Sequence, residues 1–247
     1  MMKQAPVVAC FGRRGVGKTT LARTIARHQS RLVVWDYLGE YGPLAFRTSD
    51  PDSLAEYLSW ARGRRFAAAR FIPDKGTVEE FEAFCAAVYQ SGNLLVVVEE
   101  AAAVCQASYL PPAFGRIVRQ GRHRGLGLLW CSQRLNEVSR TLTSLTDVWA
   151  GFSLSEPGDL QALALRCGRE YADKVAALPR FQWVGFDVDS QAMFTGTERL
   201  KTLWGAPAGA WPETVKEENS HLKARHVREP VTAVTRNRKF RLFPYLR

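Results

Sequence analysis

The sequence lacks any hydrophobic run long enough to cross a bilayer. Its longest clean apolar stretches, such as LLVVV at 94–98, fall far short of the roughly 20 residues that a membrane-spanning helix needs. The apolar run that precedes the first glycine-rich loop is too short for a signal peptide. We therefore expect a soluble protein without a direct membrane span, located in the cytoplasm.

Cysteine and histidine are scarce, and neither is spaced as a metal site or a disulfide framework. The five cysteines are odd in number and form no CxxC pair. They are interpreted as small buried hydrophobic residues in a reducing compartment. The four histidines show no ligand spacing, and the chain contains no internal repeat or heptad pattern.

Acidic residues are outnumbered by basic ones. The 247 residues include 34 Lys and Arg against 24 Asp and Glu, which gives a formal net charge of +10 and a pI near 9.7. This imbalance favours a polyanionic partner. On charge alone, a protein that binds nucleic acid and a basic soluble protein without a polyanionic partner are about equally good interpretations.

Apolar strands alternate with helical patterns over most of the chain. Buried strands are expected at 5–11, 31–36, 65–73, 93–100, 126–133 and 147–154, and helices at 18–29, 52–61, 77–92, 111–124, 157–168 and 169–178. Because these strands are apolar throughout, the pattern predicts an α/β fold, with a mainly parallel sheet covered by helices on both faces. Alternating residues at 181–196 predict a late β-hairpin.

The composition changes after residue 196. We expect a core at 1–196, followed at 197–247 by a linker rich in Pro, Gly and Ala and a basic C-terminal extension. Residues 216–247 carry nine Lys or Arg against three Glu. This arm either lies on a neighbouring molecule or a polyanion, or is a solvated tail.

A glycine-rich loop between the first strand and the first helix has the pattern GxxxxGK[ST]. Glycines let backbone N–H groups converge on phosphate oxygens at a helix N-terminus. Lys18 is predicted to reach the β- and γ-phosphates of ATP, and Thr19 to bind Mg²⁺. The ATP-binding residues predicted here are Gly12, Arg13, Arg14, Gly15, Val16, Gly17, Lys18, Thr19 and Thr20.

Two later buried strands end in polar residues. Open α/β sheets bind ligands at the carboxyl ends of their strands, which is where these residues lie. Glu99 is expected to hold Mg²⁺, and Glu100 to accept a proton from the attacking water. Gln133 is expected to orient that water or to sense the γ-phosphate. The alternative for each residue is an ordinary polar side chain at the end of a strand.

An arginine cluster precedes the strand at 126–133. In one continuous helix, Arg116, Arg119 and Arg122 would share a face. Arg119, Arg122 or Arg124 is a candidate for a catalytic arginine inserted into the nucleotide site of a neighbouring subunit, and together they would line a basic channel. A solvated helix face is an equally good interpretation.

Five stretches together resemble one family. They are GRRGVGKTT, VVWDYLGEYG, LLVVVEEA, RQGRHRGLGLLWCSQRLNEVSR and LSEPGDL. In this order, over residues 5–165, they resemble the HerA/FtsK superfamily of ring-forming P-loop ATPases, which have a RecA-like (ASCE) P-loop NTPase fold. The resemblance places Lys18 and Thr19 in Walker A, Glu99 and Glu100 in Walker B, and Gln133 at the sensor position. Two residues depart from the family pattern: Glu99 replaces the usual Asp, and Leu135 stands where Pro often follows the Gln-Arg pair.

The compact size is most similar to the genome-packaging ATPases of tailless, internal-membrane double-stranded DNA viruses. The chain begins at the P-loop strand, without the membrane spans of chromosome translocases or the N-terminal barrel of repair helicases. The resemblance implies ATP and Mg²⁺ as cofactors, and ATP hydrolysis coupled to movement of double-stranded DNA. It also implies a pentameric or hexameric ring, possible capsid or capsid-vertex partners, and a location in the host cytoplasm or at the packaging vertex of the virion.

Other functions remain open. They are a plasmid, conjugative or repair translocase of the same superfamily, a ParA-like partition ATPase, a small-molecule kinase, and a nucleotide-gated DNA-binding or capsid-assembly subunit that does not hydrolyse ATP. The ParA family shares GVGKTT but has a lysine early in the loop, where this chain has Arg13 and Arg14. A kinase would normally show a lid of arginines and an acceptor site, and neither is found.

Overall fold

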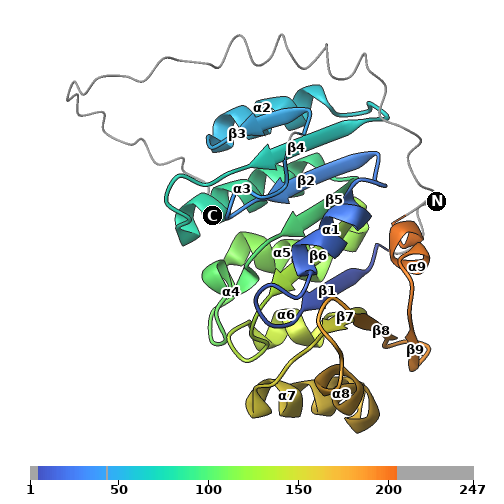
Figure 1. Ribbon diagram of the computed structural model, residues 1–247. Helices are drawn as coiled ribbons and strands as arrows, with labels where there is room; N and C mark the ends of the chain where they lie inside the picture. Colours follow the sequence, from blue (N-terminus) through green and yellow to red (C-terminus); the bar gives the residue numbers. More distant parts are fainter. Residues whose placement is uncertain (1–4, 43, 205–247) are drawn as a thin grey trace.

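A mainly parallel sheet runs through residues 5–42 and 44–204, the part of the chain that the computed structural model describes (Figure 1). Its nine strands lie in the order β3-β4-β2-β5-β6-β1-β7-β8-β9. All pairs from β3 to β7 are parallel, while β7, β8 and β9 pair antiparallel. The strands are β1 Val7–Phe11, β2 Arg31–Trp35, β3 Phe46–Thr48, β4 Ala67–Phe71, β5 Leu94–Val98, β6 Leu126–Ser132, β7 Val148–Phe152, β8 Trp183–Asp187 and β9 Ala192–Phe194.

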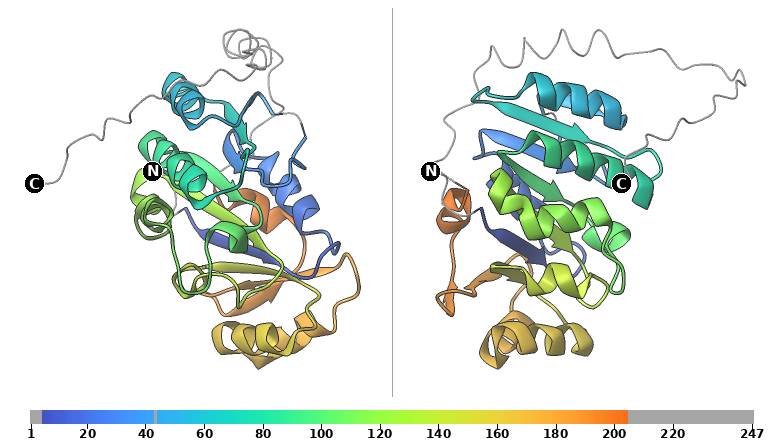
Figure 2. Two further views of the ribbon diagram at one scale, coloured as in Figure 1. Left: turned by 90° about the vertical axis from the view of Figure 1, so that its left-hand side faces the viewer. Right: turned by 180° about the vertical axis from the view of Figure 1, so that it is seen from behind.

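Helices cover both faces of this sheet (Figure 2). One face packs against α1 Lys18–Ala26 and α9 Glu198–Thr202 through Leu21, Ile25 and Leu200. The other face carries the larger core, in which Trp35 packs against Phe71, Phe81 and Phe84. The helices of that second face are α2 Pro51–Trp60, α3 Val78–Ser91, α4 Ala101–Val104, α5 Pro112–Gln120, α6 Arg140–Ser144, α7 Pro157–Cys167 and α8 Arg169–Ala176.

The predicted α/β fold, with its mainly parallel sheet and late hairpin, is confirmed. The central strands β1, β5 and β6 are buried along their whole length, which explains their continuous apolar sequence. All five cysteines are buried and unpaired, as expected. Four elements of three to five residues were not predicted from the sequence, namely β3, α4, α6 and α9.

The predicted helix at 111–124 is broken in the structure. It ends at Gln120, whose backbone leaves the helical region (φ −123°, ψ −7°), and a 3-10 helix, η1, follows at Gly121–Arg124. The prediction that Arg122 shares a helical face with Arg116 and Arg119 is therefore wrong. The shorter pitch of η1 changes the direction of the side chains that follow Gln120.

The predicted boundary at residue 196 falls just before α9, which packs on the core. Leu200 is fully buried, Gln29 donates a hydrogen bond to the Lys201 carbonyl (2.9 Å), and the Trp204 indole donates one to the Pro6 carbonyl (3.1 Å). The basic arm at 216–247 lies outside the described residues, so that part of the domain division stays a prediction.

Candidate nucleotide-binding site

The carboxyl ends of three adjacent strands bring the predicted site residues together. The strands β5, β6 and β1 are neighbours in the sheet. They lead into Glu99 and Glu100, into Gln133, and into the glycine-rich loop, respectively. Residues that are far apart in the sequence therefore meet at one edge, which we call the carboxyl edge.

The glycine-rich loop has a backbone that only glycine adopts readily. Gly12, Gly15 and Gly17 have φ values of 144°, 71° and 109°. At Gly12 the space is also closed, because a Cβ would lie 2.6 Å from the Cβ of Phe152. The Arg13 amide donates to the Ser153 carbonyl (3.1 Å), and the Arg13 guanidinium to the Ser153 hydroxyl (3.2 Å). The loop is thus held against the end of β7.

Lys18 is buried as the first residue of α1. Its ammonium donates to the carbonyls of Gly12 (2.8 Å) and Arg13 (3.0 Å), so the side chain folds back across the loop. Gly17 precedes the helix and has no side chain to cap the N–H groups of the first turn, which includes Thr19 and Thr20. A cationic side chain beside these backbone N–H groups matches the geometry that binds a phosphate.

Glu99 is a buried carboxyl group that receives a hydrogen bond from a distant tyrosine. The Tyr41 hydroxyl donates to Glu99 Oε1 at 2.9 Å, and both side chains are buried. Burial raises the pKa of Glu99 from 4.5 to about 7, against the opposing effects of the Tyr41 hydrogen bond and the Lys18 charge. A carboxylate beside Lys18 and the loop fits a Mg²⁺ site, because oxygen donors are the ligands that this ion prefers.

A loop built around Asp36 places Tyr41. The buried Asp36 carboxylate accepts hydrogen bonds from the amides of Glu40 (2.8 Å) and Tyr41 (3.1 Å). Arg70 lies 3.6 Å from the same carboxylate and donates to the Gly42 carbonyl (2.6 Å). The sequence motif DYLGEYG contained this tyrosine, but sequence reasoning gave Tyr41 no role.

Glu100 has a strained backbone and is held by Gln133. Its φ and ψ of 48° and 53° lie in the left-handed region, which is uncommon outside glycine and often marks functional positions. The Gln133 amide donates to Glu100 Oε1 at 2.9 Å. Gln133 thus fixes the carboxylate predicted to act as the base.

An ion pair fixes the segment that follows Gln133. Arg134 donates to the fully buried Asp159 carboxylate at 2.8 Å, and the Asn136 amide donates to the other oxygen of that carboxylate at 3.0 Å. These bonds connect the end of β6 to the first turn of α7. The sequence stretches CSQRLNE and SEPGD are therefore neighbours in space.

The three candidate arginines lie far from this site. Arg122 and Arg124 precede β6, at the amino edge of the sheet, and Arg119 lies in the last turn of α5, close to that edge. Seven residues of β6 separate the two edges, a distance of about 20 Å. The arginines therefore do not contact the P-loop of their own chain.

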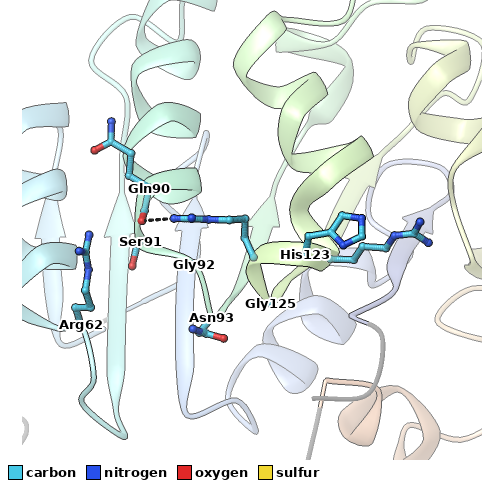
Figure 3. Close-up of a pocket in the computed structure, with 9 residues that line it drawn as sticks. Arg62, Gln90, Ser91, Gly92, Asn93, His123 and Gly125 are labelled. Atoms are coloured by element: carbon cyan, nitrogen blue, oxygen red, sulfur yellow. Dashed lines mark hydrogen bonds between the residues drawn. The ribbon is translucent and has the colours of Figure 1, made fainter. Parts of the chain in front are cut away.

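A basic pocket, shown in Figure 3, surrounds two of these arginines. The Arg124 guanidinium donates to the Gln90 carbonyl (2.8 Å), the bond drawn as a dashed line. Arg62, which sequence reasoning did not single out, contributes from the turn after α2. The pocket is lined by Arg62, Gln90, Ser91, Gly92, Asn93, Arg122, His123, Arg124 and Gly125.

The strand-loop-helix phosphate motif on a parallel sheet defines the fold of a P-loop ATPase. Solved structures agree with this class. The genome packaging NTPase B204 from Sulfolobus turreted icosahedral virus 2, in complex with AMPPCP, matches with a TM-score of 0.65 and 20% identity, over 78% of this chain and 97% of that chain. B204 from Sulfolobus turreted icosahedral virus, described as a DNA-packaging ATPase, matches with a TM-score of 0.61 and 18% identity, over 78% and 97%.

The sequence comparison gives a weaker likeness. The chain is 27% identical over 137 residues to Protein P9 of Pseudoalteromonas phage PM2, a match that spans 53% of this chain and 61% of that protein. No family model matches the chain. The resemblance to viral genome-packaging ATPases is confirmed at the level of the fold. Among the described helices, none is long and apolar enough to span a bilayer.

Proposed function

We propose that this chain is an ATP-driven double-stranded DNA translocase that packages a viral genome as part of a homo-oligomeric ring. The observation that carries the proposal is the joint placement of Lys18, Glu99 and the Gln133–Glu100 pair at one edge of the sheet. The fold it shares with B204 supports packaging as the process that uses the ATP.

Each site residue has a role that its position supports. Lys18 and the amides of residues 12–20 bind the phosphates of ATP, while Thr19 and Glu99 hold Mg²⁺. When bound, Mg²⁺ supplies positive charge to the phosphate oxygens. Glu100 accepts the proton of the attacking water, and Gln133 keeps that carboxylate in place.

The arginines at the amino edge act on the nucleotide of a neighbouring subunit. The residues that line the basic pocket include no acidic side chain. The carboxyl edge carries the P-loop with Lys18, and Asp36, Glu99 and Glu100 lie beside it. With the arginines on one edge and the nucleotide site on the other, copies of the chain can meet head to tail, and head-to-tail contacts whose rotation closes form a ring, here a pentamer or hexamer. Arg119, Arg122 and Arg124 are the candidates for the trans arginine.

The experiment that tests this function measures Mg²⁺-dependent ATP hydrolysis with and without double-stranded DNA. We expect DNA to stimulate hydrolysis, and Lys18→Ala or Glu100→Gln to abolish it. DNA affinity should fall steeply with salt, because phosphate neutralisation releases counterions. The proposal would be contradicted if the wild type hydrolysed no ATP at any concentration of DNA and protein.

Mixing two inactive variants tests the trans arginines. Chains with Lys18→Ala keep the arginines, and chains with Arg122→Ala and Arg124→Ala keep Lys18. A mixed ring therefore regains complete sites, and we expect hydrolysis to return on mixing. Arg169→Ala, an exposed arginine on α8, is the control and should keep full activity. No recovery on mixing, together with co-assembly of the two chains, would show that these arginines do not act in trans.

The remaining partners follow from the proposed process. A packaging motor delivers DNA into a capsid, so capsid or capsid-vertex proteins are the expected binding partners. The motor would act in the host cytoplasm or at the packaging vertex of the virion. Co-purification with assembled capsids, lost when the capsid protein is left out, tests this assignment.

A further inference from the structure

The loop between α8 and β8 lies against the P-loop. The Arg180 Nε donates to the Gly15 carbonyl at 3.2 Å. A Cβ at Gly15 would lie 3.3 Å from an Arg180 nitrogen, and a Cβ at Gly17 would lie 3.8 Å from the Phe181 ring. Arg180 therefore contacts the loop predicted to bind phosphate, and the Phe181 ring lies close to it.

Phe181 combines exposure with an unusual backbone. Its side chain is large and apolar, yet the residue is 64% exposed, whereas phenylalanine is usually buried. Its φ of 68° lies in the left-handed region, which bulky residues rarely adopt. The Arg180 guanidinium lies 4.7 Å from the ring centroid, and the Gln182 amide donates to the Pro179 carbonyl (3.2 Å). The ring is thus held beside the P-loop while most of its surface remains open.

The order of the strands fixes the direction in which a bound nucleotide extends. On one side of β1 lie β6 and β5, with Gln133, Glu100 and Glu99, where the terminal phosphate must be cleaved. The nucleoside therefore points to the other side of β1, toward β7 and β8. Phe181 precedes β8, and its ring lies near Gly17 on that side.

We propose that Phe181 is the stacking surface for the base of the bound nucleotide, with Arg180 holding its loop on the P-loop. This inference rests on the proposed function, because it needs a nucleoside triphosphate at residues 12–20. A flat aromatic ring stacks on the face of a purine, and such stacking does not depend on the hydrogen-bonding edge of the base. The loop supplies this ring from a segment that lies about 160 residues beyond the P-loop, and the Arg180 hydrogen bond to the Gly15 carbonyl joins the two loops.

The test compares ligands with and without a base. Binding of ATP and of inorganic tripolyphosphate is measured by calorimetry for the wild type and for Phe181→Ala. We expect the variant to bind ATP about tenfold more weakly and tripolyphosphate as tightly as the wild type does. Phe181→Trp should restore ATP binding, and its fluorescence should be quenched by ATP but not by tripolyphosphate. Tyr109→Ala, which removes an exposed aromatic from another loop, is the control.

Two results would overturn the inference. Equal loss of affinity for both ligands would show that Phe181 only shapes the P-loop, and unchanged ATP affinity in Phe181→Ala would show that the ring does not contact the base. Phe181→Leu keeps an apolar side chain and serves if the alanine variant does not fold. The proposed function fails on a separate observation, namely a wild type that binds ATP without hydrolysing it.

Discussion

Replacing Glu99 with glutamine should change how the stability of the free protein depends on pH. The Glu99 carboxyl group is buried, which raises its pKa from 4.5 to about 7. Between pH 4.5 and about 7, the folded state therefore holds a proton on Glu99 that the unfolded state has lost. The contribution of Glu99 to stability must fall as the pH rises from 4.5 to about 7, and then level off.

The size of the effect follows from the two pKa values. A difference of about 2.5 pH units corresponds to about 3 kcal/mol, at roughly 1.4 kcal/mol per unit. Glutamine resembles the protonated carboxyl group and can still accept the hydrogen bond from Tyr41. The Glu99→Gln variant should therefore match the wild type near pH 4.5 and be more stable by about 3 kcal/mol near pH 8.

Urea unfolding of both proteins between about pH 5 and pH 8, without Mg²⁺ and nucleotide, measures this difference. Other titrating groups are common to the two proteins and largely cancel in the comparison. Glu137→Gln, on the exposed segment after Gln133, is the surface control. A stability difference between Glu99→Gln and the wild type that stays constant across this range would refute the burial argument.

Three further substitutions test the geometry of the site. Tyr41→Phe removes the hydroxyl group that fixes Glu99, so the Mg²⁺ concentration for half-maximal hydrolysis should rise about tenfold. The control is Tyr57→Phe, at a buried tyrosine hydrogen-bonded to the Ala68 backbone, which should leave that Mg²⁺ concentration unchanged. Gln133→Ala frees the Glu100 carboxylate, and kcat should fall about 10- to 100-fold with little change in nucleotide affinity measured by calorimetry. Gly12→Ala forces a Cβ to 2.6 Å from Phe152 at a positive φ, and urea unfolding should show a loss of at least about 2 kcal/mol.

The fold was predictable because its signals are local. Strands buried on both faces are recognisable as continuous apolar runs. A long helix such as α3 shows apolar residues at helical spacing. The short elements left no such pattern. Three residues of β3 or five of α9 are too few to show a period, and their stability comes from packing, as the fully buried Leu200 illustrates.

The break after Gln120 shows a second limit of sequence reasoning. The arginine spacing fits one helix through Arg124, and Gly121 alone does not end a helix. In the structure, a Cβ at Gly121 would lie 3.2 Å from Leu126, so the chain turns back closely into β6. The tight turn into β6 ends the helix and moves Arg122 off the face of Arg116.

The departure at Glu99 has a physical explanation that the sequence alone did not provide. A glutamate is one methylene longer than the aspartate usual in the family that the sequence resembles, and a longer side chain has more rotamers to restrict. The Tyr41 hydroxyl, 58 positions away in the sequence, restricts the Glu99 side chain by donating a hydrogen bond to Oε1. Tyr41 is in turn placed by Asp36, which needs Arg70 to balance its buried charge. The longer acid is therefore supported by contacts from β4 and from the loop after β2, and the sequence of β5 by itself contains none of those residues.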